Sequence, residues 1–432
     1  MHIKSISIKN VRSIEELEWA VPENKAAGWH VIIGDSGTGK TTFVRCIALA
    51  LVGPAELQAM WEEWNDWMRP EEDTAQVRVE LTVDNQKDAF TGRGSVGKRK
   101  LIAGVKFVRD SENGNKVDIA EEPAALSPER YVWGSGKGWF SAGYGPFRRF
   151  SGGDKDDVRI MFTKPKLARH LSLLFESAAL GEAVGWIQSM RFKQLENKID
   201  GAFLENLKQF INQDDFLPYG ARIVDVSSEG VKFIDGNGYR VWLEDMSDGY
   251  RSVLSMTFEL IRQLEICYGS EGLFDVDGET IKVIVPGVVL IDEVDAHLHP
   301  TWQRRIGLWF RKHFPNIQFI VTTHSPLVCQ AADHGTVFKL PTPGTDETGR
   351  MITGVELDRL LYGNVLDAYS TGVFGADVTR SISGEQRLER LAELNFKELD
   401  DTLTSEERRE QENLRAMMPT TSHVLFIKGV RK

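Results

Sequence analysis

The sequence reads Val31-Ile32-Ile33 and then Gly34-Asp35-Ser36-Gly37-Thr38-Gly39-Lys40-Thr41 near its N-terminus. The octet fits the pattern G-x-x-x-x-G-K-[ST], with a hydrophobic strand before it and an apolar-faced helix after it over residues 41–51. Glycines at these positions let the backbone fold tightly, so that successive N–H groups point at phosphate oxygens at the positive end of the helix dipole. We therefore expect the loop, together with Thr42, to bind the phosphates of a nucleotide.

Side chains from this loop and from a distant strand supply the expected chemistry. Lys40 is placed to reach the β- and γ-phosphates of ATP, and Thr41 to ligate Mg²⁺ through its hydroxyl. Far along the chain, four apolar residues, 288–291, end in Asp292 and Glu293. A buried strand would bring Asp292 beside the loop, where it can hold Mg²⁺ through water, and would place Glu293 to orient or deprotonate the attacking water.

Three further segments flank these carboxylates. Before them, Met246-Ser247-Asp248-Gly249-Tyr250-Arg251 opens a predicted helix, with Ser247 as a natural N-cap and Gly249 allowing close backbone approach. After them come Val294-Asp295-Ala296-His297-Leu298-His299-Pro300, followed by Trp302-Gln303, and then a strand that ends in Thr323-His324-Ser325-Pro326. His297 and His299 are an alternative zinc pair, but a third ligand is not evident.

In this order the five motifs resemble the ATPase head of ABC-type proteins, in the form found in the SMC, RecF and OLD branch. The resemblance implies that Ser247 and Gly249 bind the γ-phosphate of a nucleotide held by the opposite subunit. It places Asp295 in the D-loop, and it implies that His324 hydrogen-bonds the γ-phosphate and senses hydrolysis. Arg12, in an N-terminal element similar to that of SMC-like heads, is a further candidate near the phosphates.

More narrowly, the chain resembles the AAA_15/AAA_21-like bacterial ATPases, particularly the PtuA-type ATPases of Septu and retron defence systems. Two local stretches carry this resemblance, residues 140–149 and residues 368–375. The glutamine of the Q-loop stays open between Gln76 and a substitute in the Tyr144-Gly145 loop.

The resemblance implies an α/β fold: an ABC-ATPase head with a mixed central sheet, an antiparallel β subdomain and a helical insertion. We expect the ATPase core in residues 1–70 and 246–340, the β subdomain and insertion in 71–245, and a helical tail for partner or oligomer contact in 341–432. It also implies a homodimer or higher homo-oligomer around ATP and Mg²⁺, and an HNH-type effector nuclease from the same operon.

Composition limits the alternatives. No apolar run in the 432 residues is long enough for a membrane helix, the N-terminus lacks the pattern of a signal peptide, and three distant cysteines fit a reducing compartment, so we expect a cytoplasmic protein. A net charge of −11 argues against a surface that is basic throughout, although residues 98–100, Lys137 and Arg148-Arg149 could line a local groove for DNA or an RNA–DNA hybrid. Trp61, Trp64 and Trp67 are expected to be buried, with base stacking as the alternative.

The sequence lacks recognisable effector chemistry of its own. No Toprim-like acidic motifs, HEPN-type Arg–His spacing or HNH-like histidine cluster follows His324, and no long coiled-coil insertion is present. We therefore expect a separate partner to perform any cleavage. The competing interpretations are a RecF-like repair clamp on duplex DNA and a nucleotide-gated scaffold that barely hydrolyses ATP.

Overall fold

The computed structural model describes residues 1–58, 64–84, 88, 100–110, 116–134, 138–148, 163–176, 180–196, 201–213, 216–278, 280–369, 371–374 and 381–417. The chain divides into two compact units, Met1–Phe374 and Gly375–Lys432. The first unit contains every predicted nucleotide-binding motif. It also contains residues 341–374, which the sequence had assigned to the tail.

The first unit is built on a six-stranded sheet in the order β16-β15-β3-β14-β13-β7. All neighbours are parallel except β15 and β16, so the predicted mixed central sheet is confirmed. The strands are β3 (Gly28–Ile33), β7 (Ser141–Tyr144), β13 (Gly287–Ile291), β14 (Ile317–Thr322), β15 (Gly335–Lys339) and β16 (Arg350–Met351). Because parallel strands end at one edge, the loops after β3, β7, β13 and β14 meet there.

The two faces of this sheet pack into different hydrophobic cores. Ile32, Leu290 and Ile320 belong to one cluster, while their chain neighbours Val31, Ile291 and others belong to the second. Successive side chains of a strand point to opposite faces, so a strand that is apolar throughout must be covered on both sides. The uninterrupted apolar runs before Gly34 and Asp292 are thereby explained.

The first face is covered by α1 (Lys40–Val52) and, beyond it, by a five-stranded antiparallel sheet. The strand order is β2-β1-β4-β5-β6, with β1 (His2–Val11), β2 (Ile14–Ala20), β4 (Thr74–Thr82), β5 (Leu101–Asp110) and β6 (Lys116–Glu121). Helix α1 lies between the two sheets, and all of its residues except Thr41 and Arg45 are buried. Since β1 pairs with β4, the boundary expected at residue 70 falls inside one sheet.

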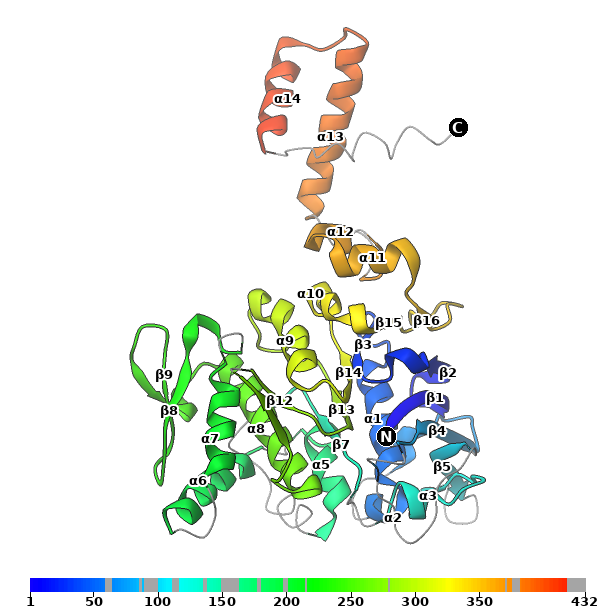
Figure 1. Cartoon of the computed structure of the whole chain (residues 1–432). Coiled ribbons are helices and arrows are strands. Elements are labelled where there is room, and N and C mark those ends of the chain that lie inside the picture. The colour runs from blue at the N-terminus through cyan, green and yellow to red at the C-terminus, as the bar shows by residue number, and fades with distance from the viewer. Residues whose placement is uncertain are drawn as a thin grey trace. The chain divides into compact units, whose positions relative to one another are not determined.

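The second face is covered by the helices that follow β7, seen beside the central strands in Figure 1. Helix α5 (Pro165–Leu174), which also follows β7, instead packs against α1 in the core of the first face. The helices of the second face are α6 (Glu182–Leu195), α7 (Ala202–Ile211), α8 (Asp248–Tyr268) and α9 (Pro300–His313). Small sheets are attached to them, with strands β8 (Arg222–Ser227), β9 (Gly230–Ile234), β10 (Arg240–Trp242), β11 (Phe274–Asp277) and β12 (Thr280–Val283). The remaining short helices are α2 (Pro54–Leu57), α3 (Pro128–Tyr131), α10 (Pro326–Cys329), α11 (Gly354–Tyr362) and α12 (Val365–Tyr369).

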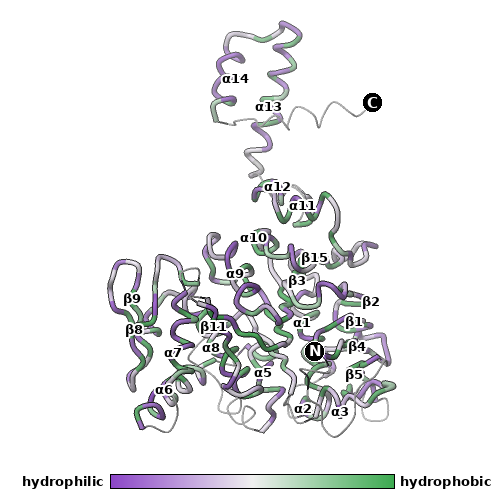
Figure 2. Tube along the Cα trace, viewed as in Figure 1, coloured by the Kyte–Doolittle hydropathy of each residue, from purple (hydrophilic) through white to green (hydrophobic). Residues whose placement is uncertain are grey.

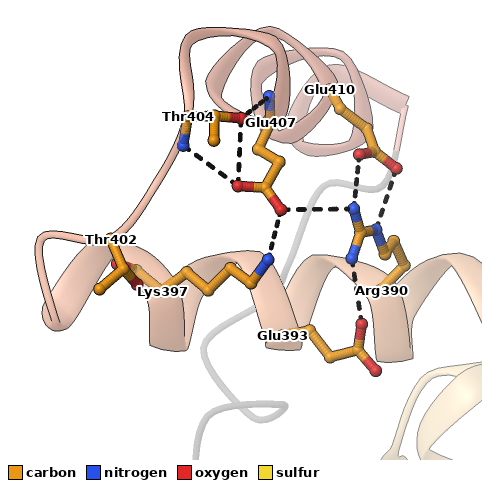
Figure 3. A network of polar contacts seen from close by, with 7 residues as sticks. All are labelled: Arg390, Glu393, Lys397, Thr402, Thr404, Glu407 and Glu410. Carbon is orange, nitrogen blue, oxygen red and sulfur yellow. Dashed lines mark hydrogen bonds and ion pairs between the residues drawn. The ribbon is translucent and has the colours of Figure 1, made fainter.

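The second unit is a helical hairpin of α13 (Ile382–Leu399) and α14 (Ser405–Met417). Figure 2 shows α14 and much of α13 as hydrophilic, and the apolar contact between them is limited to Leu391, Leu394 and Leu414, with Leu403 against them. Polar contacts join the two helices, as Figure 3 shows for Arg390 with Glu410 and for Lys397 with Glu407. The charged tail is therefore a hairpin with a very small core.

Candidate functional site

The predicted phosphate-binding loop connects β3 to α1 with the backbone that its glycines allow. Gly37 and Gly39 have φ angles of 83° and 92°, a region that residues with a β-carbon rarely adopt. Thr38 closes the turn by donating from its hydroxyl to the Asp35 carbonyl at 2.9 Å. A β-carbon at Gly39 would lie 3.1 Å from Ser13 Oγ, so the turn between β1 and β2 packs directly against the loop.

Lys40 lies folded into the loop. Its Nζ donates to the carbonyl oxygens of Gly34 at 2.8 Å and Asp35 at 2.9 Å. Burial lowers the pKa of Lys40, while the carboxylates of Asp292 and Glu293 oppose that shift. A partly buried ammonium held by loop carbonyls is poised to exchange them for phosphate oxygens, which are stronger acceptors.

Thr41 and Asp292 meet as the sequence predicts, although 251 positions separate them. Thr41 Oγ1 donates to Asp292 Oδ2 at 2.8 Å, and Thr322 Oγ1 donates to Asp292 Oδ1 at 2.6 Å. Asp292 is almost fully buried at the end of β13, and its N–H donates to the Tyr144 carbonyl at 2.8 Å. Each oxygen of the carboxylate is thus held by a threonine hydroxyl.

Glu293 is half-buried and has a φ of 46°, a left-handed conformation that is unusual for a residue with a β-carbon. Its N–H donates to Thr322 Oγ1 at 2.8 Å, and its carbonyl accepts from Arg148 Nη2 at 2.8 Å. Both of its backbone groups are therefore bound by side chains from other strands or loops.

The segments after β13 and β14 are tied together. Thr323 Oγ1 donates to Asp295 Oδ1 at 2.5 Å, and Ser325 Oγ donates to Gln303 Oε1 at 2.8 Å. His324, between these two anchors, is exposed. The predicted D-loop and the predicted H-loop are thus one connected unit.

His299 has a structural role, since its ring nitrogen accepts from the Thr301 N–H at the start of α9. Among the described residues, no group of three or more His, Cys, Asp or Glu is arranged to hold a metal ion. A nucleotide-linked Mg²⁺ does not need such a group, because Thr41, one carboxylate, phosphates and water can supply its ligands. Thr41 and Asp292 fit that requirement.

Ser247 is exposed at the N-terminus of α8, although its side chain makes no capping hydrogen bond to the described residues. Gly249 lies close to the D-loop, since a β-carbon there would be 2.9 Å from the His297 carbonyl oxygen. Ser247 lines a hollow of about 530 Å³ with residues of the β8–β10 region, and within the described chain none of residues 34–41 lines it. Ser247 therefore lines this hollow without any residue of its own phosphate loop.

Arg12 is close to the loop through its neighbour Ser13, but its guanidinium lies over the Trp67 ring, 4.0 Å from the centroid. Trp64 and Trp67 are buried, as expected, and Trp61 lies outside the described residues. The two candidate Q-loop positions lie in different sheets. Gln76 pairs with Lys9 and Lys106 within the antiparallel sheet, whereas the Tyr144-Gly145 loop follows β7 directly beside Asp292.

Sequence reasoning missed Thr322 and the role of Arg148. Thr322 was visible only as the last residue of an apolar strand, a position whose side chain the parallel register places beside Asp292. The suggestion that Arg148 could line a basic groove was wrong, because the residue is only 5% exposed and its guanidinium donates inward to the Glu293 carbonyl. Lys100 contacts Glu80, and residues 98, 99, 137 and 149 lie outside the described chain.

Two family models match the chain. AAA_23, "AAA domain", matches residues 5–126, and AAA_21, "AAA domain, putative AbiEii toxin, Type IV TA system", matches residues 167–330. The first contains the phosphate loop, and the second contains the segments around Ser247, Asp292, Asp295 and His324. Both matches are to AAA domains, and between them they contain the five motifs predicted to bind nucleotide.

Curated proteins that are similar to the chain carry the names of two systems, Septu and retron. The chain is 25% identical over 347 residues to the Septu protein PtuA of Bacillus mycoides (strain KBAB4). This aligned region covers 78% of the present chain and 40% of the Bacillus mycoides protein. The chain is 32% identical over 152 residues to the Retron Ec83 probable ATPase of Escherichia coli. This aligned region covers 34% of the present chain and 27% of the Escherichia coli protein. The Septu protein PtuA of Bacillus thuringiensis is 29% identical over 201 residues, 45% of this chain and 48% of that one. The chain thus spans less than half the length of each of these relatives.

Solved structures that resemble the chain are SMC head domains. An SMC head bound to the C-winged helix domain of ScpA gives a TM-score of 0.46 at 14% identity, over 82% of this chain and 97% of that one. The SMC head domain from Thermotoga maritima gives 0.39 at 12% identity, over 82% and 99%. In the described part of this chain, none of the helices has the length and apolar character needed to cross a lipid bilayer.

Proposed function

We propose that the protein binds and hydrolyses ATP with Mg²⁺ and that the nucleotide state controls a separate effector. The observation that carries the proposal is the 2.8 Å contact between Thr41 Oγ1 and Asp292 Oδ2 at the edge where the phosphate loop ends. It brings together the hydroxyl and the carboxylate that P-loop ATPases use for Mg²⁺.

In this proposal Lys40 leaves the Gly34 and Asp35 carbonyls and binds the β- and γ-phosphates, while the N–H groups of residues 34–42 surround them. Thr41 and Asp292 would hold Mg²⁺, which would supply positive charge beside the phosphate oxygens when bound. Glu293 orients the attacking water and accepts its proton. His324, held between two anchored neighbours, contacts the γ-phosphate and so distinguishes ATP from ADP.

We further propose that two chains share each nucleotide. Ser247 is exposed and belongs to a hollow that contains no residue of its own phosphate loop, so it is available to a nucleotide bound by a second copy. Gly249 lies against the carbonyl of His297, two residues after Asp295, and in this proposal both Gly249 and Asp295 contact the second copy. A homodimer is the smallest assembly that satisfies this arrangement, and Arg12 would lie near the phosphates after leaving Trp67.

The effector is proposed from the relatives. Similarity to Septu PtuA and to a retron ATPase favours a role in anti-phage defence, with an HNH-type nuclease from the same operon as the partner. Co-expression with that neighbour should yield a co-purifying complex whose protection against phage is lost in Glu293→Gln. Duplex binding that needs ATP and weakens steeply with salt, without such a partner, would favour the RecF-like clamp.

Hydrolysis is tested by Glu293→Gln, which keeps the shape of the side chain but removes the base. We expect ATP turnover to fall by about 100-fold or more, with the affinity for a slowly hydrolysed analogue retained. Glu229→Gln, an exposed residue on the β8–β9 turn, is the matched control and should behave as wild type. Undiminished turnover in Glu293→Gln would remove Glu293 from this role, and a wild type that binds ATP without turnover would favour the scaffold.

Sharing of sites is tested by mixing two inactive variants, Lys40→Ala and Ser247→Arg. In a mixed dimer one site combines both substitutions, whereas the other combines an intact loop with an intact Ser247. Mixing should therefore restore about a quarter of wild-type turnover, since half of the dimers are mixed and each has one working site. A mixture as inactive as its components would contradict the shared-site arrangement.

A further inference from the structure

Arg148 is a buried cation that the proposed reaction does not yet use. It follows β7 by four residues, and its side chain is almost fully enclosed. Nη2 donates to the Glu293 carbonyl oxygen at 2.8 Å, Nη1 lies 3.9 Å from Met256 Sδ, and Nε is buried without a hydrogen-bond partner among the described residues. A guanidinium with so few partners is unfavourable to bury, which calls for a reason why this arginine lies here.

The charges around Arg148 are those of the nucleotide site. Asp292, Glu293 and Asp295 are the carboxylates that attract its positive charge. Burial lowers the pKa of Arg148 to about 10, so the group remains protonated at neutral pH. Arg148 therefore places a permanent charge beside the acidic residues at the end of β13.

The hydrogen bond from Arg148 is made to Glu293, a residue whose backbone conformation is energetically unfavourable. Glu293 has a φ of 46°, and a β-carbon makes this left-handed conformation costly. Thr322 holds its N–H and Arg148 holds its carbonyl, so rotation toward an ordinary conformation would break one or both bonds. Together these bonds fix the direction in which the Glu293 side chain leaves the backbone.

Arg148 is itself held by α8. Ser255 Oγ donates to the Arg148 carbonyl at 3.2 Å, and Met256, on the same helix, contacts the guanidinium. Helix α8 begins just after Ser247. The arginine thus lies between the helix that carries Ser247 and the residue expected to activate water.

We propose that Arg148 is a positioning residue for ATP hydrolysis, which holds the Glu293 carbonyl and thereby orients the Glu293 carboxylate. This role rests on the proposed ATPase function and adds a residue that acts through Glu293. Loss of the guanidinium should therefore impair turnover while leaving the phosphate loop, and hence nucleotide binding, intact.

The test compares Arg148→Ala with Arg169→Ala. Arg169 is a second buried arginine, which belongs to α5 and whose guanidinium lies over the ring of Phe140. For Arg148→Ala we expect kcat to fall roughly 10- to 100-fold while KM and the Kd of a fluorescent ATP analogue with Mg²⁺ stay within about threefold. Millimolar guanidinium should restore part of kcat in Arg148→Ala but not in Glu293→Gln. Arg169→Ala should leave kcat close to wild type, with no response to guanidinium.

Wild-type kcat in Arg148→Ala would overturn the proposal. So would a fall in kcat matched by equal losses of nucleotide affinity and thermal stability without guanidinium rescue, because that pattern describes a structural residue. If Arg148→Ala does not fold, Arg148→Lys replaces it in the test, since lysine keeps the positive charge but lacks the forked donors of the guanidinium. A fall in kcat with an unchanged Kd in Arg148→Lys would support the positioning role, and an unchanged kcat would overturn it. A wild type that lacks turnover would instead refute the proposed ATPase function, which separates the two failures.

Discussion

Thr322→Val should destabilise the first unit more than any ordinary threonine substitution in its core. The change keeps the side chain's shape but removes a hydroxyl that donates to Asp292 Oδ1 at 2.6 Å and accepts from the Glu293 N–H at 2.8 Å. Thr322 and Asp292 are buried, so water cannot readily replace these bonds. The bond to the carboxylate is the stronger of the two, and with the unsatisfied N–H the free energy of unfolding should fall by about 3 kcal/mol. In a unit of this size that loss lowers Tm by about 4 °C.

The measurement is urea unfolding followed by tryptophan fluorescence, together with a thermal melt. Thr257→Val is the matched control, because Thr257 Oγ1 is buried without a hydrogen-bond partner among the described residues, and the change should cost less than about 0.5 kcal/mol or be stabilising. Thr322→Ser keeps the hydroxyl and should lose only about 1 kcal/mol for its methyl group. Equal stabilities of Thr322→Val and Thr257→Val would refute the reasoning that these two bonds hold the end of β13.

Two further predictions concern pH and the helical hairpin. Burial lowers the pKa of His30 to about 4 and that of His170 to about 3, below the ordinary value of about 6.5, so both are neutral in the folded state. The stability that depends on their neutral form is fully present well above pH 6.5 and is lost as the pH falls through 6.5, by about 3 kcal/mol for the pair between pH 6.5 and pH 5. Thermal melts at pH 7 and pH 5 should show this loss, His170→Gln should reduce it, and a Tm that does not change would contradict it. In the hairpin, Leu394→Ala removes the central residue of a three-leucine core and should lower the local free energy of unfolding by at least about 2 kcal/mol. Limited proteolysis of the full chain should therefore cut this variant faster within residues 382–417 than it cuts the control Glu410→Gln. The control removes only one charge of an exposed ion pair. Equal cutting rates would show that the leucines do not hold the helices together.

Local pattern was sufficient to predict the nucleotide loop and the two buried strands that end just before Gly34 and Asp292. The run before Gly34 and the run before Asp292 are apolar without alternation, which indicates strands buried on both faces. Strands β9 and β10 pair across Asp235-Gly236-Asn237-Gly238, residues that favour a tight turn between two strands. These features depend on neighbours in the chain, so the sequence carries them directly.

Contacts between distant segments required the tertiary structure. The sequence indicated that Asp292 should meet Thr41, but only the parallel register of β13 and β14 places Thr322 against both Asp292 and Glu293. Arg148 looked like a surface cation, because burial of a charge depends on which helix covers it and which carbonyl it meets. The antiparallel sheet likewise joins β1 to β4 across the domain boundary that was expected at residue 70. Periodicity and turn residues are local properties of the chain, whereas burial, register and the partners of a charged group are fixed only when distant segments pack together.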